Sequence, residues 1–169
     1  MRVALVLFLT LYLLRALVAE ANTALSGLHV WLFADGLFVV YSALMVPFRQ
    51  GFAASVLGGL LCDSLTPVPF GTHAALFGAA HAAVYNLRER LQREETAVRV
   101  VIVVALNAAF FVVITLARVR HVPAVASVWP RLLSDFGWSE AAVALAAPWF
   151  FALQMRSLEL ARAVPARSA

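Results

Sequence analysis

Long apolar runs alternate along the chain with short stretches that contain nearly all of its arginines. The runs are continuous and rich in alanine and leucine, which favours helices over the alternating ten-residue segments of a membrane barrel. A membrane-spanning helix needs about 20 mainly apolar residues. We therefore expect an all-α integral membrane protein, a bundle of six transmembrane helices. The six predicted spans cover about residues 3–19, 28–46, 51–65, 70–87, 100–117 and 139–155.

Prolines and charged residues mark the connections between these spans. The third and fourth spans form a predicted helical hairpin, because two prolines at 66–69 prevent a helix from continuing through the turn. The sixth span contains Pro148. Before it we expect a long external loop over about 118–138, with Trp129 at headgroup depth. A short tail over about 156–169 follows the last span.

The composition agrees with a single polytopic membrane domain over residues 1–169. Hydrophobic residues make up 63% of the chain, charged residues 13%, and the mean hydropathy is +0.89. Soluble domains carry about 25% charged residues, so a soluble enzyme, a nucleic-acid reader and a disordered tail are poor interpretations. The first span resembles a cleaved signal peptide at Ala19-Glu20-Ala21, but Arg15 interrupts its apolar run, and a retained helix is preferred.

The arginines predict the orientation of the chain. All 13 basic residues are arginines, and an N-terminus in the cytoplasm places nine of them inside, three outside and Arg15 within a span. The positive-inside rule then predicts that both termini are cytoplasmic. The predicted cytoplasmic loop over about 88–99 contains Arg88, Arg90 and Arg93. It is either a solvated turn or a docking patch for a cytoplasmic partner or for anionic lipid heads.

Charged residues inside predicted spans are functional candidates, because inserting each one costs about 2.5–3.5 kcal/mol. Arg15, Asp35 and Asp63 fall in the outer half of the membrane, and His73 lies at the same depth. Three interpretations stay open. Arg15 snorkels outward while Asp63 sits in interfacial water. Alternatively, a structural ion pair or three-way cluster joins the first three spans. In the third interpretation, these groups form a ligand or proton site.

Other polar and small residues also lie within the spans. His81 and Asn107 fall near the middle of the fourth and fifth spans, and we expect a hydrogen bond between them to tether the two helices. The third span carries small residues at helical spacing, which let helices approach closely. These faces serve packing within the bundle or contact with a partner's transmembrane helix. They are Gly51, Ser55 and Gly59 on one face, and Ala54, Gly58 and Cys62 on the next.

The sequence contains no recognised catalytic motif: HExxH, GxSxG and the P-loop do not occur. Its four histidines lack metal-ligand spacing, and the single Cys62 excludes an internal disulfide. Asp35 and Asp63 suggest an intramembrane aspartyl protease, but the flank GGLLCDSL lacks the Gly-x-Gly-Asp pattern of that class. We therefore expect no enzyme, no cofactor and no metal site, and an unrecognised intramembrane hydrolase ranks last among the alternatives.

The stretch from Asp35 to Leu91 resembles the core of the rod shape-determining protein MreD family. The pattern GLLCD with a following Gly71 is the most specific part. Two features depart from the family pattern: the turn has two prolines, and Cys62 stands where the family usually has an aliphatic residue. Three segments carry the resemblance: DGLFVVYSAL at 35–44, GFAASVLGGLLCDSLTPVPFGTHAALFG at 51–78 and AVYNLRERLQREE at 83–95.

This resemblance implies a non-catalytic scaffold of the bacterial elongation (rod) complex in the inner membrane. Family members bind the bitopic protein MreC and connect MreB filaments with the RodA glycosyltransferase and its class B penicillin-binding protein. We further expect contact with membrane lipids and no binding of nucleic acid. Whether the chain forms a homodimer is left open. The family is similar in architecture to the substrate-binding subunits of energy-coupling-factor vitamin transporters. The alternative is therefore such a subunit, with an outer pocket formed by Arg15, Asp35, Asp63 and His73.

Overall fold

The computed structural model describes residues 2–90, 95–119 and 125–161, and these residues form helices and connections without strands. A short 3-10 helix, η1 (Ser26–Leu28), follows the first α-helix. The described α-helices are α1 (Arg2–Leu25), α2 (Asp35–Met45), α3 (Phe48–Leu65), α4 (Thr72–Leu87), α5 (Thr96–Val119) and α6 (Val125–Leu160).

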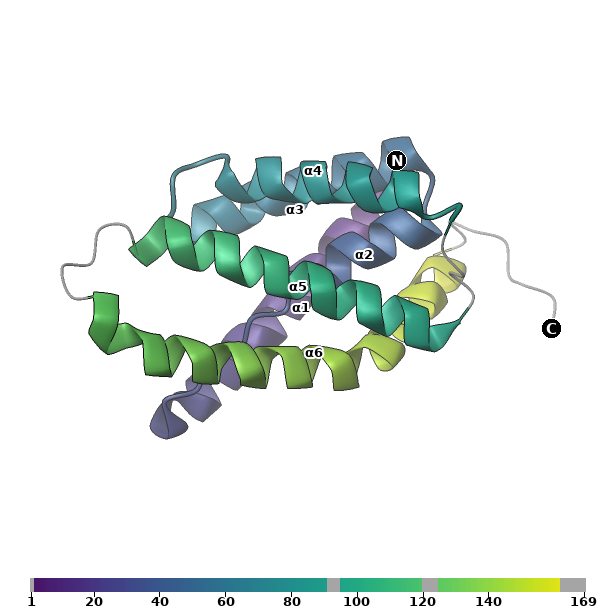
Figure 1. Ribbon diagram of the computed structural model, residues 1–169. Helices are drawn as coiled ribbons and strands as arrows, with labels where there is room; N and C mark the ends of the chain where they lie inside the picture. The colour runs from purple at the N-terminus through teal and green to yellow at the C-terminus, as the bar shows by residue number, and fades with distance from the viewer. Residues whose placement is uncertain (1, 91–94, 120–124, 162–169) are drawn as a thin grey trace.

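The helices form two antiparallel pairs with α2 between them (Figure 1). One pair is α3 and α4, the other is α5 and α6, and α1 crosses the back of the bundle. The start of α1, the end of α6 and the short connection from α2 to α3 lie at one end. The turn from α3 to α4 and the end of α5 lie at the opposite end, called here the distal end. The chain thus alternates between the two ends of the bundle.

Among the described residues, three helices are long and apolar enough to cross a membrane, which indicates a membrane protein. They cover Val3–Leu28, Thr96–Arg118 and Val128–Leu160. The surface agrees with a lipid environment. Along α1, a stripe of leucines one turn apart is more than half exposed, and such a surface is favourable in lipid and costly in water. The stripe consists of Leu5, Leu9, Leu13 and Leu17.

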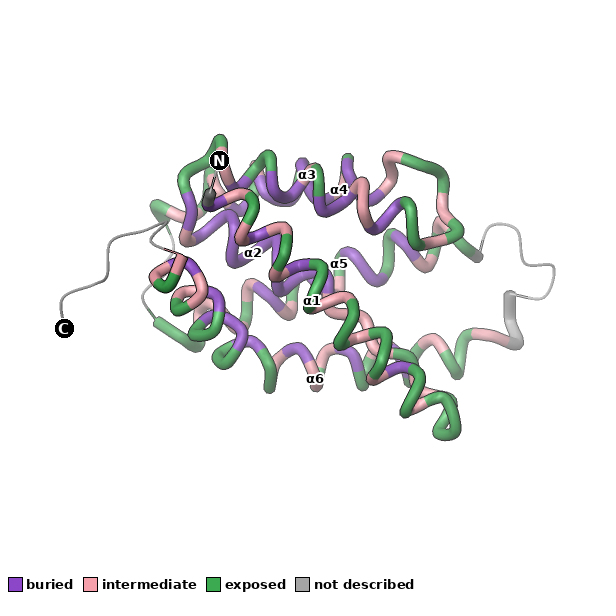
Figure 2. Tube along the Cα trace, turned by 180° about the vertical axis from the view of Figure 1, so that it is seen from behind, coloured by how far each residue is buried: buried purple, intermediate pink, exposed green. Residues whose placement is uncertain are grey.

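Helix α2 is the centre of the core. Every residue from Asp35 to Leu44 is buried (Figure 2). Tyr41 packs edge-on against Phe151 of α6 with ring centroids 5.3 Å apart. With 11 residues, α2 is about 16 Å long, shorter than a bilayer core of about 30 Å. The predicted span 28–46 is therefore helical only in its second part, because the chain is not α-helical between Leu28 and Asp35.

The connection before the last predicted span also differs from the prediction. Of the predicted loop over 118–138, residues 120–124 lie outside the described residues, and from Val125 onward the structure has a helix instead, which continues through Pro130 and Pro148 to Leu160. The prediction was wrong because it treated proline as a helix breaker. Proline removes one backbone hydrogen bond, but a helix packed among others can continue through it.

Small residues on α3 allow close packing inside the bundle. A Cβ atom on Gly59 would overlap the backbone of Ala74 on α4, and one on Gly58 would overlap the side chain of Leu11 on α1. Gly51 lies equally close to His81. The faces that contain Gly58 and Gly59 are thus used within the chain, which is the packing interpretation of the small-residue pattern.

Candidate functional site

An ion pair joins α1 to the beginning of α2. Nη1 of Arg15 donates to Oδ1 of Asp35 at 2.7 Å, and the Asp35 side chain is only 2% exposed. Asp35 occupies the first turn of α2, where free N–H groups and the helix dipole favour a carboxylate. The structure therefore shows the pair that was one of the open interpretations of these two residues.

Asp63 has a different set of partners, at the N-terminus of α4. Its carboxylate accepts backbone N–H groups from Gly71 at 2.9 Å, His73 at 2.9 Å and Ala74 at 3.2 Å. It also lies 2.8 Å from Nδ1 of His73. Gly71 adopts φ = 95°, a conformation that glycine tolerates best, and it turns the chain into α4. Asp63 therefore caps the next helix, and the three-way cluster with Arg15 and Asp35 does not form.

Between η1 and α2 the chain is not α-helical, and side chains from three helices pair with its backbone. Asn22 bonds both to the N–H and to the C=O of Leu32, at 2.6 and 3.0 Å. Ser139 of α6 accepts from the N–H of Phe33, and Asp135 accepts from that of Trp31. Backbone outside a helix keeps its polar groups satisfied where protein groups pair with it in this way.

Asn107 of α5 completes this arrangement. Its amide donates to the C=O of Phe33 at 3.1 Å and to a carboxylate oxygen of Glu140 at 3.0 Å. Its carbonyl oxygen accepts the N–H of Gly36 at 3.2 Å. The expected bond between Asn107 and His81 was wrong, because His81 lies instead beside Ser42 and Ser55. The sequence contained a usable signal, since an isolated asparagine inside an apolar span needs partners.

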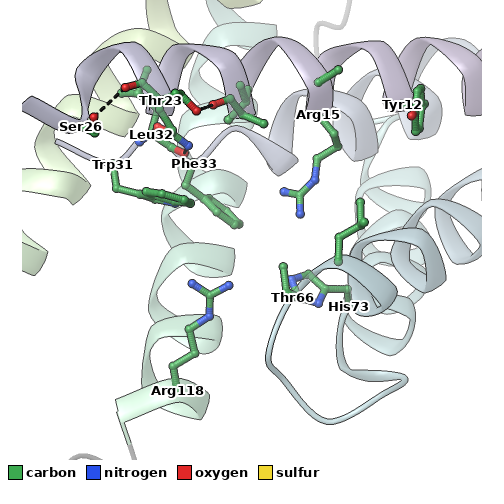
Figure 3. A pocket seen from close by; sticks show the side chains of 15 residues that line it. Tyr12, Arg15, Thr23, Ser26, Trp31, Leu32, Phe33, Thr66, His73 and Arg118 are labelled. Carbon is green, nitrogen blue, oxygen red and sulfur yellow. Dashed lines mark hydrogen bonds between the residues drawn. The ribbon is translucent and has the colours of Figure 1, made fainter.

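A cavity of about 640 Å³ opens at the distal end between α1 and the ends of α3 and α5. Residues 29–34, called here the extended segment, form another part of its wall. Arg15, His73 and Arg118 contribute cationic or basic side chains to its wall. In Figure 3, Arg15 points in from α1, and Arg118 approaches from α5 on the opposite side. Asp35 and Asp63 are not part of the wall. Two of the four residues predicted to form an outer pocket thus line this cavity, and Arg118 had been counted only as a topology signal.

Two of the arginines named in the predicted cytoplasmic loop, Arg88 and Arg90, directly follow the end of α4. The guanidinium of Arg88 is stacked 3.7 Å from the centroid of the Tyr85 ring. Arg90 is exposed, and Arg93 lies outside the described residues. Arg88 is therefore held against its own helix, whereas Arg90 is accessible.

Within the part of the chain that the structure describes, no group of three or more His, Cys, Asp or Glu side chains is placed to hold a metal ion. Comparisons of the chain with protein-family models, curated proteins and solved structures found no match. A functional proposal for this chain therefore rests on its sequence and on the geometry of its side chains.

Proposed function

We propose that this chain is a non-catalytic scaffold of the MreD type in the bacterial inner membrane, where it binds MreC. Through MreC it would couple MreB filaments to RodA and a class B penicillin-binding protein, and so maintain cell shape. One observation carries this proposal. The residues on which the resemblance rests serve to hold α3 and α4 together.

In the hairpin of α3 and α4, the residues of the GLLCD pattern have a structural role in two ways. Gly59 allows the two backbones to touch, and Asp63 fixes the beginning of α4 by accepting the N–H groups of Gly71, His73 and Ala74. A carboxylate engaged in this way is not free to act as a general acid or base, which requires access to a substrate proton. A chain whose motif carboxylate is occupied in this way is suited to act through its surface.

Under this proposal, all six α-helices lie within the membrane, as in the substrate-binding subunits of energy-coupling-factor transporters. The two termini and the loop at 88–99 face the cytoplasm, and the distal end faces outward. The membrane-facing surface available to a transmembrane helix of MreC is broad. It includes the exposed leucines of α1 as well as exposed residues of α5 and α6, among them Val113 and Leu145.

Co-purification tests the proposal. The tagged full chain is extracted from membranes in mild detergent together with MreC from the same cells, and the amount of MreC retained is measured. We expect a stable complex, and we expect rounded cells when the chain is depleted. An unrelated polytopic protein with the same tag is the control. Failure to retain MreC, together with normal cell shape after depletion, would contradict the proposal.

The cavity at the distal end favours a second candidate, a substrate-binding subunit of a small-molecule transporter. At about 640 Å³ the cavity has the size of a small-molecule site, and Arg15 and His73 are in its wall. Thermal-shift screening of the purified chain with vitamins separates the two candidates. A ligand that binds only the folded state raises the melting temperature, and such a vitamin would favour the transporter.

A further inference from the structure

The wall of the distal cavity contains two arginines, and among the described residues only one of them is paired with a carboxylate. Arg15 is paired with the buried carboxylate of Asp35 behind it. Arg118 faces the same cavity, and within the described ranges no carboxylate lies within 4.0 Å of it. The cavity wall itself contains two arginines and His73 but no acidic residue. Two guanidinium groups across one cavity repel each other, and this repulsion is stronger near lipid than in water.

We propose that this cavity binds an oxyanion, a phosphate or carboxylate group, between Arg15 and Arg118. The guanidinium group is the side chain best suited to this task, because it offers several N–H donors in a planar fork that matches both anions. An anion at this position would relieve the repulsion between the two arginines. It would also leave the pair between Arg15 and Asp35 intact, since that pair uses only one oxygen of Asp35 and Nη1 of Arg15.

The rest of the wall is suited to an anion that carries an apolar part. Val18 and Ala19 of α1, Phe33 of the extended segment and Leu65 of α3 contribute apolar surface beside the arginines. The cavity lies at the end of the bundle that would be level with the lipid headgroups. The oxyanion could therefore come from the head of an anionic phospholipid or from a free phosphate, and the experiment distinguishes these two sources.

The experiment uses the full chain, delipidated in a neutral detergent, with thermal unfolding as the measurement. One arm adds phosphatidylglycerol, a second adds a diacylglycerol with the same acyl chains but no phosphate, and a third adds inorganic phosphate at constant ionic strength. Arg118→Gln is compared with Arg131→Gln, which removes an arginine from α6, outside the cavity wall, with a side chain 62% exposed. Arg15 is left intact, because its removal would strand the Asp35 carboxylate and confuse binding with folding.

We expect phosphatidylglycerol to raise the melting temperature of the wild type and of Arg131→Gln. For Arg118→Gln we expect the midpoint of the lipid titration to be about tenfold weaker, as for the loss of one charge-assisted contact. A similar shift with inorganic phosphate would identify a free oxyanion as sufficient, and a shift with phosphatidylglycerol alone would identify the lipid head.

Three results would overturn the inference: equal responses of the two variants, equal responses to phosphatidylglycerol and to the diacylglycerol without phosphate, or no response to either anion. The measurement needs no MreC, so its failure would leave the scaffold proposal standing, and the reverse also holds.

Discussion

The cap that Asp63 provides to α4 makes a quantitative prediction about stability. Replacing Asp63 with alanine removes the acceptor of three backbone N–H groups and the partner of the His73 ring. A hydrogen bond to a charged group contributes about 1.5–3 kcal/mol, and water reaches part of the turn once the carboxylate is gone. We therefore expect a loss of about 3 kcal/mol. For a chain of this size, that lowers the melting temperature by roughly 6–12 °C.

Two further variants make this measurement specific. Asp63→Asn retains one acceptor oxygen and is expected to lose about half as much stability. Ser64→Ala changes the neighbouring residue, whose hydroxyl is exposed and bonds only within its own helix, to Leu61. Unfolding in detergent, followed by tryptophan fluorescence, gives the three melting temperatures. If Asp63→Ala melted within about 2 °C of Ser64→Ala, the cap would not be the reason for this aspartate.

Three other substitutions are predicted, each followed in the same unfolding assay. Arg15→Gln leaves the Asp35 carboxylate buried and unpaired, at a cost of about 3–5 kcal/mol in stability. Adding Asp35→Asn is expected to restore part of the lost stability. If the losses of the two substitutions were additive, the two residues would not be a coupled pair. Gly59→Ala forces α3 away from α4 and is expected to lower the stability of the chain far more than Gly27→Ala, whose added methyl group meets open space. Equal losses of stability in the two variants would disprove the close contact. Asn107→Ala leaves the N–H of Gly36 and the C=O of Phe33 without their hydrogen-bond partner, at a cost of about 1–3 kcal/mol each. An unchanged melting temperature would count against a role of Asn107 in holding this backbone.

Much of the helical architecture could be predicted because apolar runs and prolines are local signals. The fifth predicted span, 100–117, lies within α5 and differs from it by only a few residues at each end. The two prolines at 66–69 correctly marked the turn between α3 and α4. The ion pair of Arg15 and Asp35 was among the interpretations that the sequence allowed, because two opposite charges at the same depth in a membrane attract each other.

The extended segment before α2 could not be predicted from local signals. Residues 29–34 are mostly apolar, and hydropathy alone treats such a run as part of a helix. The helix is interrupted there because Asn22, Asn107 and Ser139, on three different helices, supply the hydrogen bonds that the backbone would otherwise lack. These hydrogen bonds depend on the tertiary structure, and a single sequence does not show which polar residues come into contact.

The cavity was missed in part for the same reason. Arg118 follows a clean apolar run and was therefore interpreted as a sign of membrane orientation. Its role in the cavity depends on where the end of α5 lies relative to α1, which only the fold determines. Conversely, a cluster of Asp63 with Arg15 was among the open interpretations because both were predicted at the same depth, but depth does not fix the position around the bundle.

Site-specific photo-crosslinking in living cells tests the scaffold proposal most directly. A photoreactive residue is placed at one exposed position on each of the three helices that are long and apolar enough to cross a membrane, at Leu13, Val113 and Leu145. The fully buried Leu11 is the control position. We predict an adduct of this chain with MreC from at least one exposed position and none from Leu11. If a scan of the exposed positions yielded no MreC adduct while the chain was present at its normal level, the scaffold proposal would be contradicted.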